Sequence, residues 1–186
     1  LCPTLATATP GKLLDENLPF LRRVVCLDKS LIRRGLQDWE DFLAEGAVIP
    51  QPMVDAAAAC SSPVDAGLVF FSSGSTAQPK AIQQTHRAAA LQLWRFVHWY
   101  GVDSAVKTWR ANGFFWSGNF TQAIGATFTV GGCLVLQRYF DPGEALRLMQ
   151  AERVTLPVAW PHQWVKLAED PAFHEVDLGS LRYVGE

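Results

Sequence analysis

One short stretch constrains this chain more than any other, the string Phe70-Phe71-Ser72-Ser73-Gly74-Ser75-Thr76-Ala77-Gln78-Pro79-Lys80. The segment 67–71 is apolar and rich in aromatic and β-branched residues, which predicts a buried strand with the polar residues in a loop at its end. Such a loop can bind phosphate, because Gly74 leaves backbone N–H groups accessible and Lys80 supplies a mobile positive charge. Further donors are the hydroxyls of Ser72, Ser73, Ser75 and Thr76.

Two other interpretations of the stretch are a Walker loop and a plain Ser/Gly turn. The Walker loop has a glycine, four residues, and then Gly-Lys-Ser/Thr. Counting from Gly74, Lys80 fits that spacing, but Pro79 and Ala81 replace the second glycine and the hydroxyl that binds magnesium. A plain Ser/Gly turn with a solvated lysine is the other alternative. The ordered Pro-Lys pair that follows the hydroxyls favours the phosphate loop.

The stretch resembles the phosphate-loop signature of the AMP-forming adenylate ligases, which include acyl-CoA synthetases, luciferases and the adenylation domains of peptide synthetases. Residues 71–76 match that signature, and so do Pro79 and Lys80. Ala77 and Ala81 stand where the family usually carries glycine. If either position requires a positive φ, alanine there costs about 1–2 kcal/mol.

Composition limits the other classes of function. The chain has 186 residues, of which 49% are hydrophobic, so it can build one core or two small ones. Its formal net charge of −2 provides no broad basic field, which argues against nucleic acid as the main partner. No apolar run reaches the length of a membrane span, and residues 1–4 lack the basic start of a secretion signal. We therefore expect a cytoplasmic protein.

The cysteines and histidines do not indicate a metal site. Cys2, Cys26, Cys60 and Cys133 are widely separated, and no cluster of His, Cys and acidic residues has zinc-ligand spacing. We expect four free thiols that behave as small hydrophobic side chains.

The order of the elements predicts an α/β fold with mostly parallel sheets flanked by helices. Pattern and capping signals indicate strands at 21–28, 67–71, 133–137, 154–158 and 181–184, an extended segment at 82–84, and helices at 37–46, 86–100, 121–129, 142–152 and 161–169. We expect Thr85 and Asp141 to cap the helices that follow them, and one further helical turn within 49–65. Residues 1–66 would form the strand, helix and linker of a first subdomain. Residues 67–186 would form the phosphate loop, a substrate-pocket segment and part of a second α/β subdomain, within a single incomplete domain.

A second informative segment, 109–120, places four aromatic residues around two glycines, which either pack a core or line an apolar slot. The resembling family carries Phe-His-x-x-Gly here, at its acyl or aryl pocket. Phe114 and Gly118 match that phrase, whereas Phe115 replaces the histidine, which favours an apolar acid. The resemblance therefore implies a substrate pocket formed by Phe114, Phe115, Trp116 and Gly118.

The resemblance also implies the chemistry. In this family a carboxylate attacks the α-phosphate of ATP, and the acyl-adenylate then passes to a thiol such as coenzyme A, with Mg²⁺ accompanying the nucleotide. The implied phosphate ligands are Ser72, Ser73, Gly74, Ser75, Thr76 and Lys80. Lys80 and His86 would be the catalytic residues, although His86 could equally be a surface residue in the first turn of a helix. Gly185 and Glu186 stand where the family begins its adenine-binding loop.

The resemblance covers only a middle portion of the family's large N-terminal domain. The Tyr-Gly-x-Thr-Glu phrase, the ribose-binding aspartate and the small C-terminal domain with its catalytic lysine have no counterpart in this sequence. We therefore expect a fragment or a degenerate relative of an acyl-CoA synthetase, inactive without the missing C-terminal portion of the same enzyme. A peptide-synthetase adenylation domain and a catalytically incomplete remnant that only binds nucleotide are the alternatives.

Overall fold

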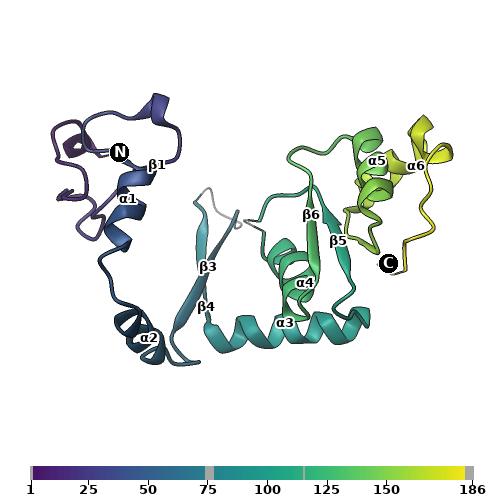
Figure 1. The fold of residues 1–186 in the computed structure, drawn as a ribbon, viewed down its shortest axis with the longest axis horizontal. Coiled ribbons are helices and arrows are strands. Elements are labelled where there is room, and N and C mark those ends of the chain that lie inside the picture. Colours follow the sequence, from purple (N-terminus) through teal and green to yellow (C-terminus); the bar gives the residue numbers. More distant parts are fainter. Residues whose placement is uncertain (1, 74–77, 115, 183–186) are drawn as a thin grey trace. The chain divides into compact units, whose positions relative to one another are not determined.

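The computed structural model describes residues 2–73, 78–114 and 116–182, and the chain divides into two compact units, Leu1–Ser61 and Ser62–Glu186 (Figure 1). Helices and strands alternate along both units, and three of the four strand pairs in the described residues are parallel. The predicted α/β class with mostly parallel strands is therefore confirmed. The predicted subdomain division after residue 66 stays a prediction.

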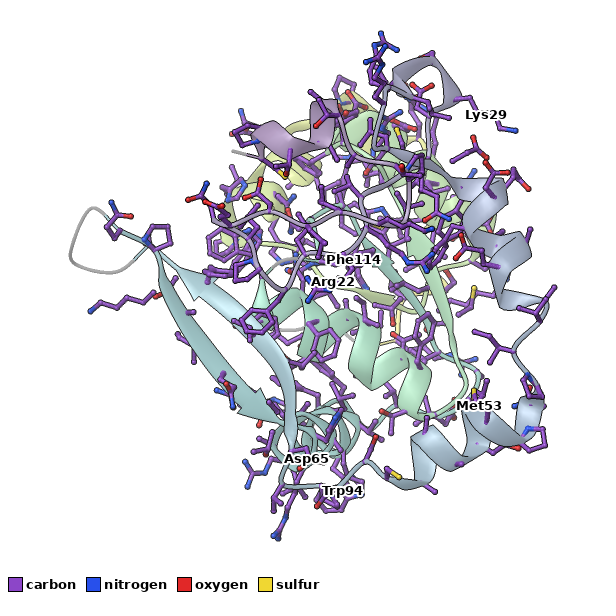
Figure 2. All side chains as sticks on the ribbon, turned by 90° about the vertical axis from the view of Figure 1, so that its left-hand side faces the viewer. Arg22, Lys29, Met53, Asp65, Trp94 and Phe114 are labelled. Carbon is purple, nitrogen blue, oxygen red and sulfur yellow. The ribbon has the colours of Figure 1, made fainter. Side chains whose placement is uncertain are left out.

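The first unit contains short elements around a small parallel strand pair. Its elements are the 3₁₀ helices η1 (Pro3–Ala6) and η2 (Lys29–Leu31), the strands β1 (Val25–Cys26) and β2 (Gln37–Asp38), and the helices α1 (Trp39–Gly46) and α2 (Gln51–Ala59). The Asp38 carboxylate accepts a hydrogen bond from the backbone N–H of Glu40 at 2.8 Å and so caps α1. The side chain of Met53 on α2 is exposed (Figure 2).

Three predictions for this unit need correction. The strand expected at 21–28 extends only over Val25–Cys26, because its partner β2 offers just two residues for pairing. The helix expected from Gln37 begins at Trp39, because Gln37 and Asp38 form that partner strand. In place of the single helical turn expected in the linker 49–65, the chain forms the nine-residue helix α2.

The second unit begins with a hairpin and continues into a three-stranded parallel sheet. Its strands are β3 (Ala66–Ser72), β4 (Lys80–Thr85), β5 (Lys107–Arg110), β6 (Cys133–Leu136) and β7 (Leu156–Pro157). Its helices are α3 (His86–Tyr100), the π-helix η3 (Asn119–Gly125), α4 (Ala126–Thr129), α5 (Pro142–Glu152), α6 (Pro161–Glu169) and the 3₁₀ helix η4 (Pro171–His174). None of the helices within the described ranges combines the length and the apolar character that crossing a bilayer requires.

Helix α3 connects the hairpin to the sheet (Figure 1). Thr85 caps its N-terminus, since the Thr85 hydroxyl accepts from the backbone N–H of Ala88 at 3.1 Å. Gly101 ends the helix with a φ of +62°, a conformation that glycine adopts without a Cβ clash. The predicted helix 86–100 and its Thr85 cap are thus confirmed, and Trp94 is an exposed residue of its outer side (Figure 2).

Strand β5 lies at the centre of the sheet, between β6 and β7, and both pairings are parallel. Its Trp109 is fully buried in the main core, together with Val135, Ala145, Leu146, Met149, Val154, Leu167 and Ala172. The helices α5 and α6 bring the apolar side chains of that core against the sheet. Their bounds agree with the predicted 142–152 and 161–169, and the Asp141 carboxylate caps α5 by accepting from the Glu144 N–H at 2.7 Å.

Several strand predictions in this unit also need correction. The sequence did not predict β5, although it is the central strand. No residue of β3 is buried, and of the four residues of β6 only Val135 is, because each of these strands pairs on one side only in the described residues. Strand β7 covers two of the five residues expected at 154–158. Leu181 and Arg182 are not in a strand, and the rest of 181–184 lies outside the described residues.

The helix expected at 121–129 begins two residues earlier, at Asn119. It is a π-helix up to Gly125 and an α-helix only over Ala126–Thr129. A Cβ at Gly125 would lie 1.9 Å from a methyl carbon of Leu93, so the absence of a side chain there permits the close contact between this helix and α3.

Candidate functional site

The β3–β4 hairpin brings the two ends of the predicted phosphate loop together. Ser72 and Lys80 are paired across the antiparallel strands, so their side chains lie on the same face of the hairpin. Ser73 and Lys80 are exposed, and neither of the two ion pairs formed by the described residues includes Lys80. The predicted ligands Gly74, Ser75 and Thr76 lie outside the described residues. The Ser72 hydroxyl and the Lys80 ammonium are thus positioned beside each other, where an anion can reach both.

His86 occupies the other end of β4 from Lys80. It is the first residue of α3, and six residue steps along an extended strand separate the two by about 20 Å. The structure therefore does not bring His86 and Lys80 together, although the family resemblance implied that both serve one site. The catalytic role of His86 stays a prediction.

The absence of a side chain at Gly67 allows His86 to lie close against β3. A Cβ on Gly67 would lie 2.8 Å from Nδ1 and 2.9 Å from the backbone nitrogen of His86. The strand register shifts at this point, between Ala66 and Leu68, so Gly67 is the extra residue of a β-bulge. The backbone N–H of His86 also donates to the carbonyl of Asp65 at 3.1 Å. These contacts anchor the start of α3 at the base of the hairpin.

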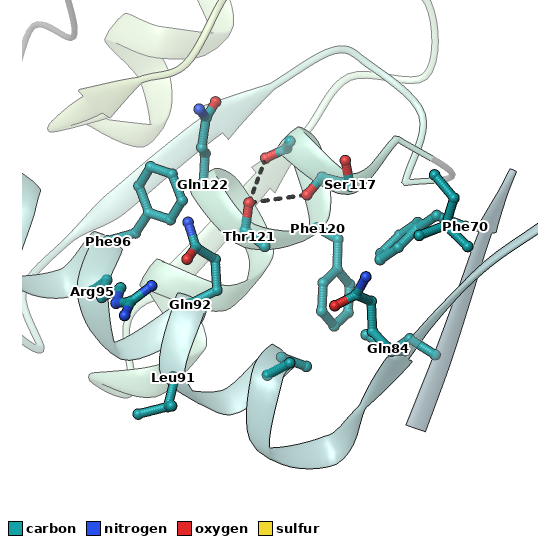
Figure 3. A pocket seen from close by; sticks show the side chains of 15 residues that line it. Phe70, Gln84, Leu91, Gln92, Arg95, Phe96, Ser117, Phe120, Thr121 and Gln122 are labelled. Atoms are coloured by element: carbon teal, nitrogen blue, oxygen red, sulfur yellow. Dashed lines mark hydrogen bonds between the residues drawn. The ribbon is translucent and has the colours of Figure 1, made fainter. Parts of the chain in front are cut away.

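A cavity of about 710 Å³ lies between the hairpin, α3 and η3 (Figure 3). Phe70 from β3 and Phe120 from η3 pack there with ring centroids 5.9 Å apart. The side chains of Gln84, Gln92 and Arg95 add polar groups to an otherwise largely apolar lining (Figure 3). A cavity of this size and mixed lining suits a small organic molecule with an apolar body and one or two polar groups.

The cavity meets both of the segments that the sequence singled out. Phe70 belongs to the strand that leads into the phosphate loop, and Ser117 and Gly118 belong to the aromatic-glycine segment. The hydroxyl of Thr121 donates to the carbonyl of Ser117 at 2.9 Å, and the carbonyl of Gly118 lies 3.4 Å from the same hydroxyl (Figure 3). These contacts hold Ser117 and Gly118 at the start of the π-helix.

The other predicted pocket residues are placed differently. Phe114 and Trp116 are 42% and 53% exposed, and neither lines this cavity. Phe115 lies outside the described residues, as do Gly185 and Glu186 of the predicted adenine loop. The substrate role of Phe114 and Trp116 stays a prediction. Within the described part of the chain, no group of three or more His, Cys, Asp or Glu residues could hold a metal ion.

The pair that positions the aromatic-glycine segment, Arg110 and Asn119, was not predicted from the sequence. Asn119 is fully buried, and its side-chain amide donates to the carbonyl of Gly113 at 2.5 Å. Its carbonyl oxygen accepts from Nη2 of Arg110, which is also buried. The only signal in the sequence was an arginine placed directly after an apolar tryptophan, and that pattern does not distinguish a buried guanidinium from a solvated one.

Comparison with known proteins finds a family match and several relatives for this chain. Residues 7–186 match the family described as "AMP-binding enzyme". The chain is 30% identical over 179 residues to 3-[(3aS,4S,7aS)-7a-methyl-1,5-dioxo-octahydro-1H-inden-4-yl]propanoyl:CoA ligase of Mycobacterium tuberculosis, a match that covers 89% of this chain and 32% of that enzyme. It is also 30% identical over 151 residues to medium/long-chain-fatty-acid–CoA ligase FadD8 of the same organism, covering 77% of this chain and 24% of that enzyme.

The solved structures agree on the fold. ATP-bound MatB from Rhodopseudomonas palustris superposes with a TM-score of 0.59 at 22% identity, over 70% of this chain and 27% of that one. The chain spans about a third or less of the length of the two Mycobacterium tuberculosis ligases that it matches. The match over residues 7–186 and the identity to the propanoyl:CoA ligase show that the chain belongs to the family of AMP-binding enzymes.

Proposed function

We propose that the full-length protein is an ATP-dependent, AMP-forming acid–thiol ligase of the acyl-CoA synthetase type. It would adenylate a carboxylic acid and transfer the acyl group to coenzyme A. The observation that carries the proposal is the pairing of Ser72 with Lys80 at the loop end of a hairpin whose strand β3 also lines the cavity beside it. The family membership and the names of the relatives support it. Because the chain matches about a third of those relatives, we propose that the reaction needs further parts of the same enzyme.

We propose that the loop holds the β- and γ-phosphates of ATP. The residues are those predicted from the sequence: Ser72, Ser73, Gly74, Ser75, Thr76 and Lys80. Hydroxyl and backbone N–H groups donate to phosphate oxygens, and the lysine ammonium balances the charge that develops on departing pyrophosphate. ATP would supply the adenylyl group that the carboxylate takes up at the α-phosphate as pyrophosphate leaves. The chain's own residues would position the phosphates and balance their negative charge. Mg²⁺ would arrive with the nucleotide, with Ser72 and Lys80 contacting the phosphates rather than the metal.

We propose that the 710 Å³ cavity receives the acid. Phe70 and Phe120 would contact its apolar body, with Gly118 leaving room at the start of η3, and Phe114, Phe115 and Trp116 would border the entrance. Because His86 lies far from Lys80, we propose that it acts indirectly. As the first residue of α3, it would help to orient this helix, which lines the cavity. A cytoplasmic location is part of the proposal and agrees with the four free thiols.

Two measurements test the proposed function. Calorimetric titration of the chain with ATP should show binding, and Lys80→Met should weaken it at least tenfold, a loss of about 1.4 kcal/mol. Lys166→Met is the matched control, because Lys166 is an exposed lysine of α6 that pairs only with Glu169, and its ATP affinity should stay within twofold. Equal ATP affinity in the Lys80→Met variant would rule out the phosphate role.

The reaction itself is tested on the full-length protein. Acid-dependent exchange of labelled pyrophosphate into ATP is expected, because adenylation of the acid is reversible. Formation of ADP and phosphate, or exchange that is independent of any carboxylic acid, would contradict an AMP-forming ligase. Exchange with amino acids alone would favour the peptide-synthetase alternative.

A further inference from the structure

Helix α3 presents aromatic and basic side chains to solvent on the side opposite to its packed residues. With 3.6 residues per turn, six exposed side chains fall within one half of the helix circumference, and they form the outer face of α3: Arg87, Leu91, Trp94, Arg95, His98 and Trp99. Leu91 is 41% exposed, Trp94 is 54% exposed (Figure 2) and Trp99 is 80% exposed. The second unit therefore leaves two indoles and a leucine of a single helix open to water.

Both indoles are supported by neighbours on α3 itself. The ring centroids of Trp94 and His98 are 4.0 Å apart, and Nδ1 of His98 lies 2.9 Å from the carbonyl oxygen of Trp94. The ring of Trp99 stacks on that of Phe96, with their centroids 5.9 Å apart. The aromatic side chains are thus held in place on the surface, as a site that receives a partner requires. Contiguous exposed apolar surface of this kind marks an interaction site.

The charge around α3 has a single sign. No acidic residue occurs in the sequence between Asp65 and Asp103, and this range includes all of β3, β4 and α3. The helices η3 and α4, which also pack against α3, contain no acidic residue either. The side chains of Asp65 and Asp103 bond within their own loops, where they accept from the backbone N–H groups of Ser62 at 2.7 Å and Ala105 at 2.8 Å.

The arginines of the outer face have no counter-charge among the described residues. Neither of the two ion pairs formed there includes Arg87 or Arg95. The whole chain has a formal net charge of −2, so this basic face is a local feature of α3 and not a property of the composition. A partner that covers the face must therefore supply negative charge as well as an apolar layer.

We propose that the outer face of α3 docks on the surface of an anionic lipid bilayer. The indoles would lie at the boundary between headgroups and acyl chains, where tryptophan is enriched, and the arginines would contact lipid phosphates. A second copy of the chain fits less well, because two such faces would bring four arginines together without an acid. The face includes no residue assigned to ATP, and the proposal does not rest on the proposed function.

The test is co-sedimentation of the full-length protein with vesicles. Vesicles of equal parts phosphatidylglycerol and phosphatidylcholine should bind it at least tenfold more tightly than vesicles of phosphatidylcholine alone. Binding should weaken at about 1 M NaCl, where the Debye length is only about 3 Å. Trp94→Ala with Trp99→Ala should lower binding at least tenfold. Tyr139→Ala is the matched control, because Tyr139 is a 72% exposed aromatic residue outside α3, and binding should stay within twofold.

A charge reversal tests the electrostatic part separately. Arg95 also lines the first cavity, so the variant is Arg87→Glu. It should lower binding at least tenfold, since an attraction becomes a repulsion, and a glutamate in the first turn suits the helix dipole, so α3 should still form. Arg147→Glu makes the same change at an exposed position of α5 and should leave vesicle binding within twofold.

Four results would overturn the proposal. The first is vesicle binding that neither the paired tryptophan variant nor Arg87→Glu weakens, and the second is equal binding to both kinds of vesicle. The third is a lipid-free dimer that the tryptophan variant separates, which would make the face an interface between copies. The fourth is an unaltered protein that binds no vesicles, which would leave an acidic protein surface as the occupant.

Discussion

Ser72 and Lys80 are direct cross-strand partners, the last residue of β3 and the first residue of β4. The chain leaves β3 after Ser72 and enters β4 at Lys80. The loop that carries the remaining predicted phosphate ligands is therefore closed at its base by this pair. Closure by a strand pair fixes the backbone positions from which the Ser72 and Lys80 side chains extend, and this removes part of the entropy that a free loop would lose when it binds phosphate.

The hairpin register predicts a specific cross-link. In a background with the four native cysteines replaced by serine, Ser72→Cys with Lys80→Cys should form a disulfide on mild oxidation. Directly paired residues have Cα atoms about 4.5–5.5 Å apart, within the range that a disulfide spans. Ser72→Cys with Ala81→Cys is the control, because Ala81 pairs with Phe71 and points to the other face. Peptide mass spectrometry measures both yields, and equal yields would show that the register is wrong.

Gly67→Ala should destabilise the second unit. The new Cβ would meet the ring and backbone of His86 at 2.8 and 2.9 Å, so the bulge or α3 must shift, at a cost of about 1–3 kcal/mol in the free energy of unfolding. Gly118→Ala is the matched control, since a Cβ there meets nothing within 4 Å and its φ of −60° suits alanine. Urea denaturation measures the two changes. A Gly67→Ala variant as stable as the Gly118→Ala variant would refute the contact.

Thr85→Ala should remove the cap of α3. The Ala88 N–H loses its acceptor, and we expect a loss of about 1 kcal/mol in the free energy of unfolding, with faster amide hydrogen exchange at Ala88. Thr85→Ser keeps a hydroxyl in the same place and should retain most of the stability and the slow exchange. If serine and alanine behave alike at this position, the hydroxyl is not the cap.

Asp15 should titrate below its ordinary value in the first unit. Its carboxylate accepts from the Thr4 hydroxyl at 2.5 Å and from the backbone N–H of Asn17 at 2.9 Å, and these bonds, the Thr4 bond first, lower its pKa from 3.8. Since the folded pKa is the lower one, the carboxylate's contribution to stability is present above about pH 4 and is lost as the pH falls through the folded pKa. Carbonyl-carbon NMR of Asp15 measures the shift.

Thr4→Val removes the strongest of these bonds and should raise the pKa of Asp15 towards 3.8. Thr7→Val is the control, because the Thr7 hydroxyl donates to the Thr4 carbonyl and makes no bond with Asp15. An Asp15 pKa that is unchanged by Thr4→Val, or equally changed by Thr7→Val, would show that the hydroxyl is not the cause.

The sequence by itself determined the helices with clear end signals and the extended segments, now β3 and β4, on either side of the predicted phosphate loop. Thr85 with Gly101, and Asp141 with Pro142, set the ends of α3 and the start of α5, because a cap forms between residues only a few positions apart. The family resemblance was also readable from consecutive residues, since the loop signature is continuous along the chain, and the match over residues 7–186 confirmed it.

Only the tertiary structure decided which residues meet. The resemblance implied that His86 and Lys80 serve one site, whereas the extended strand β4 carries His86 about 20 Å from Lys80. Nothing in the sequence indicated that β5 is the central strand or that Arg110 is buried, because Arg110 bonds to Val158, 48 positions further along the chain. Caps and turns depend on neighbouring residues, but burial and strand pairing depend on distant partners, so they are fixed only when the chain folds.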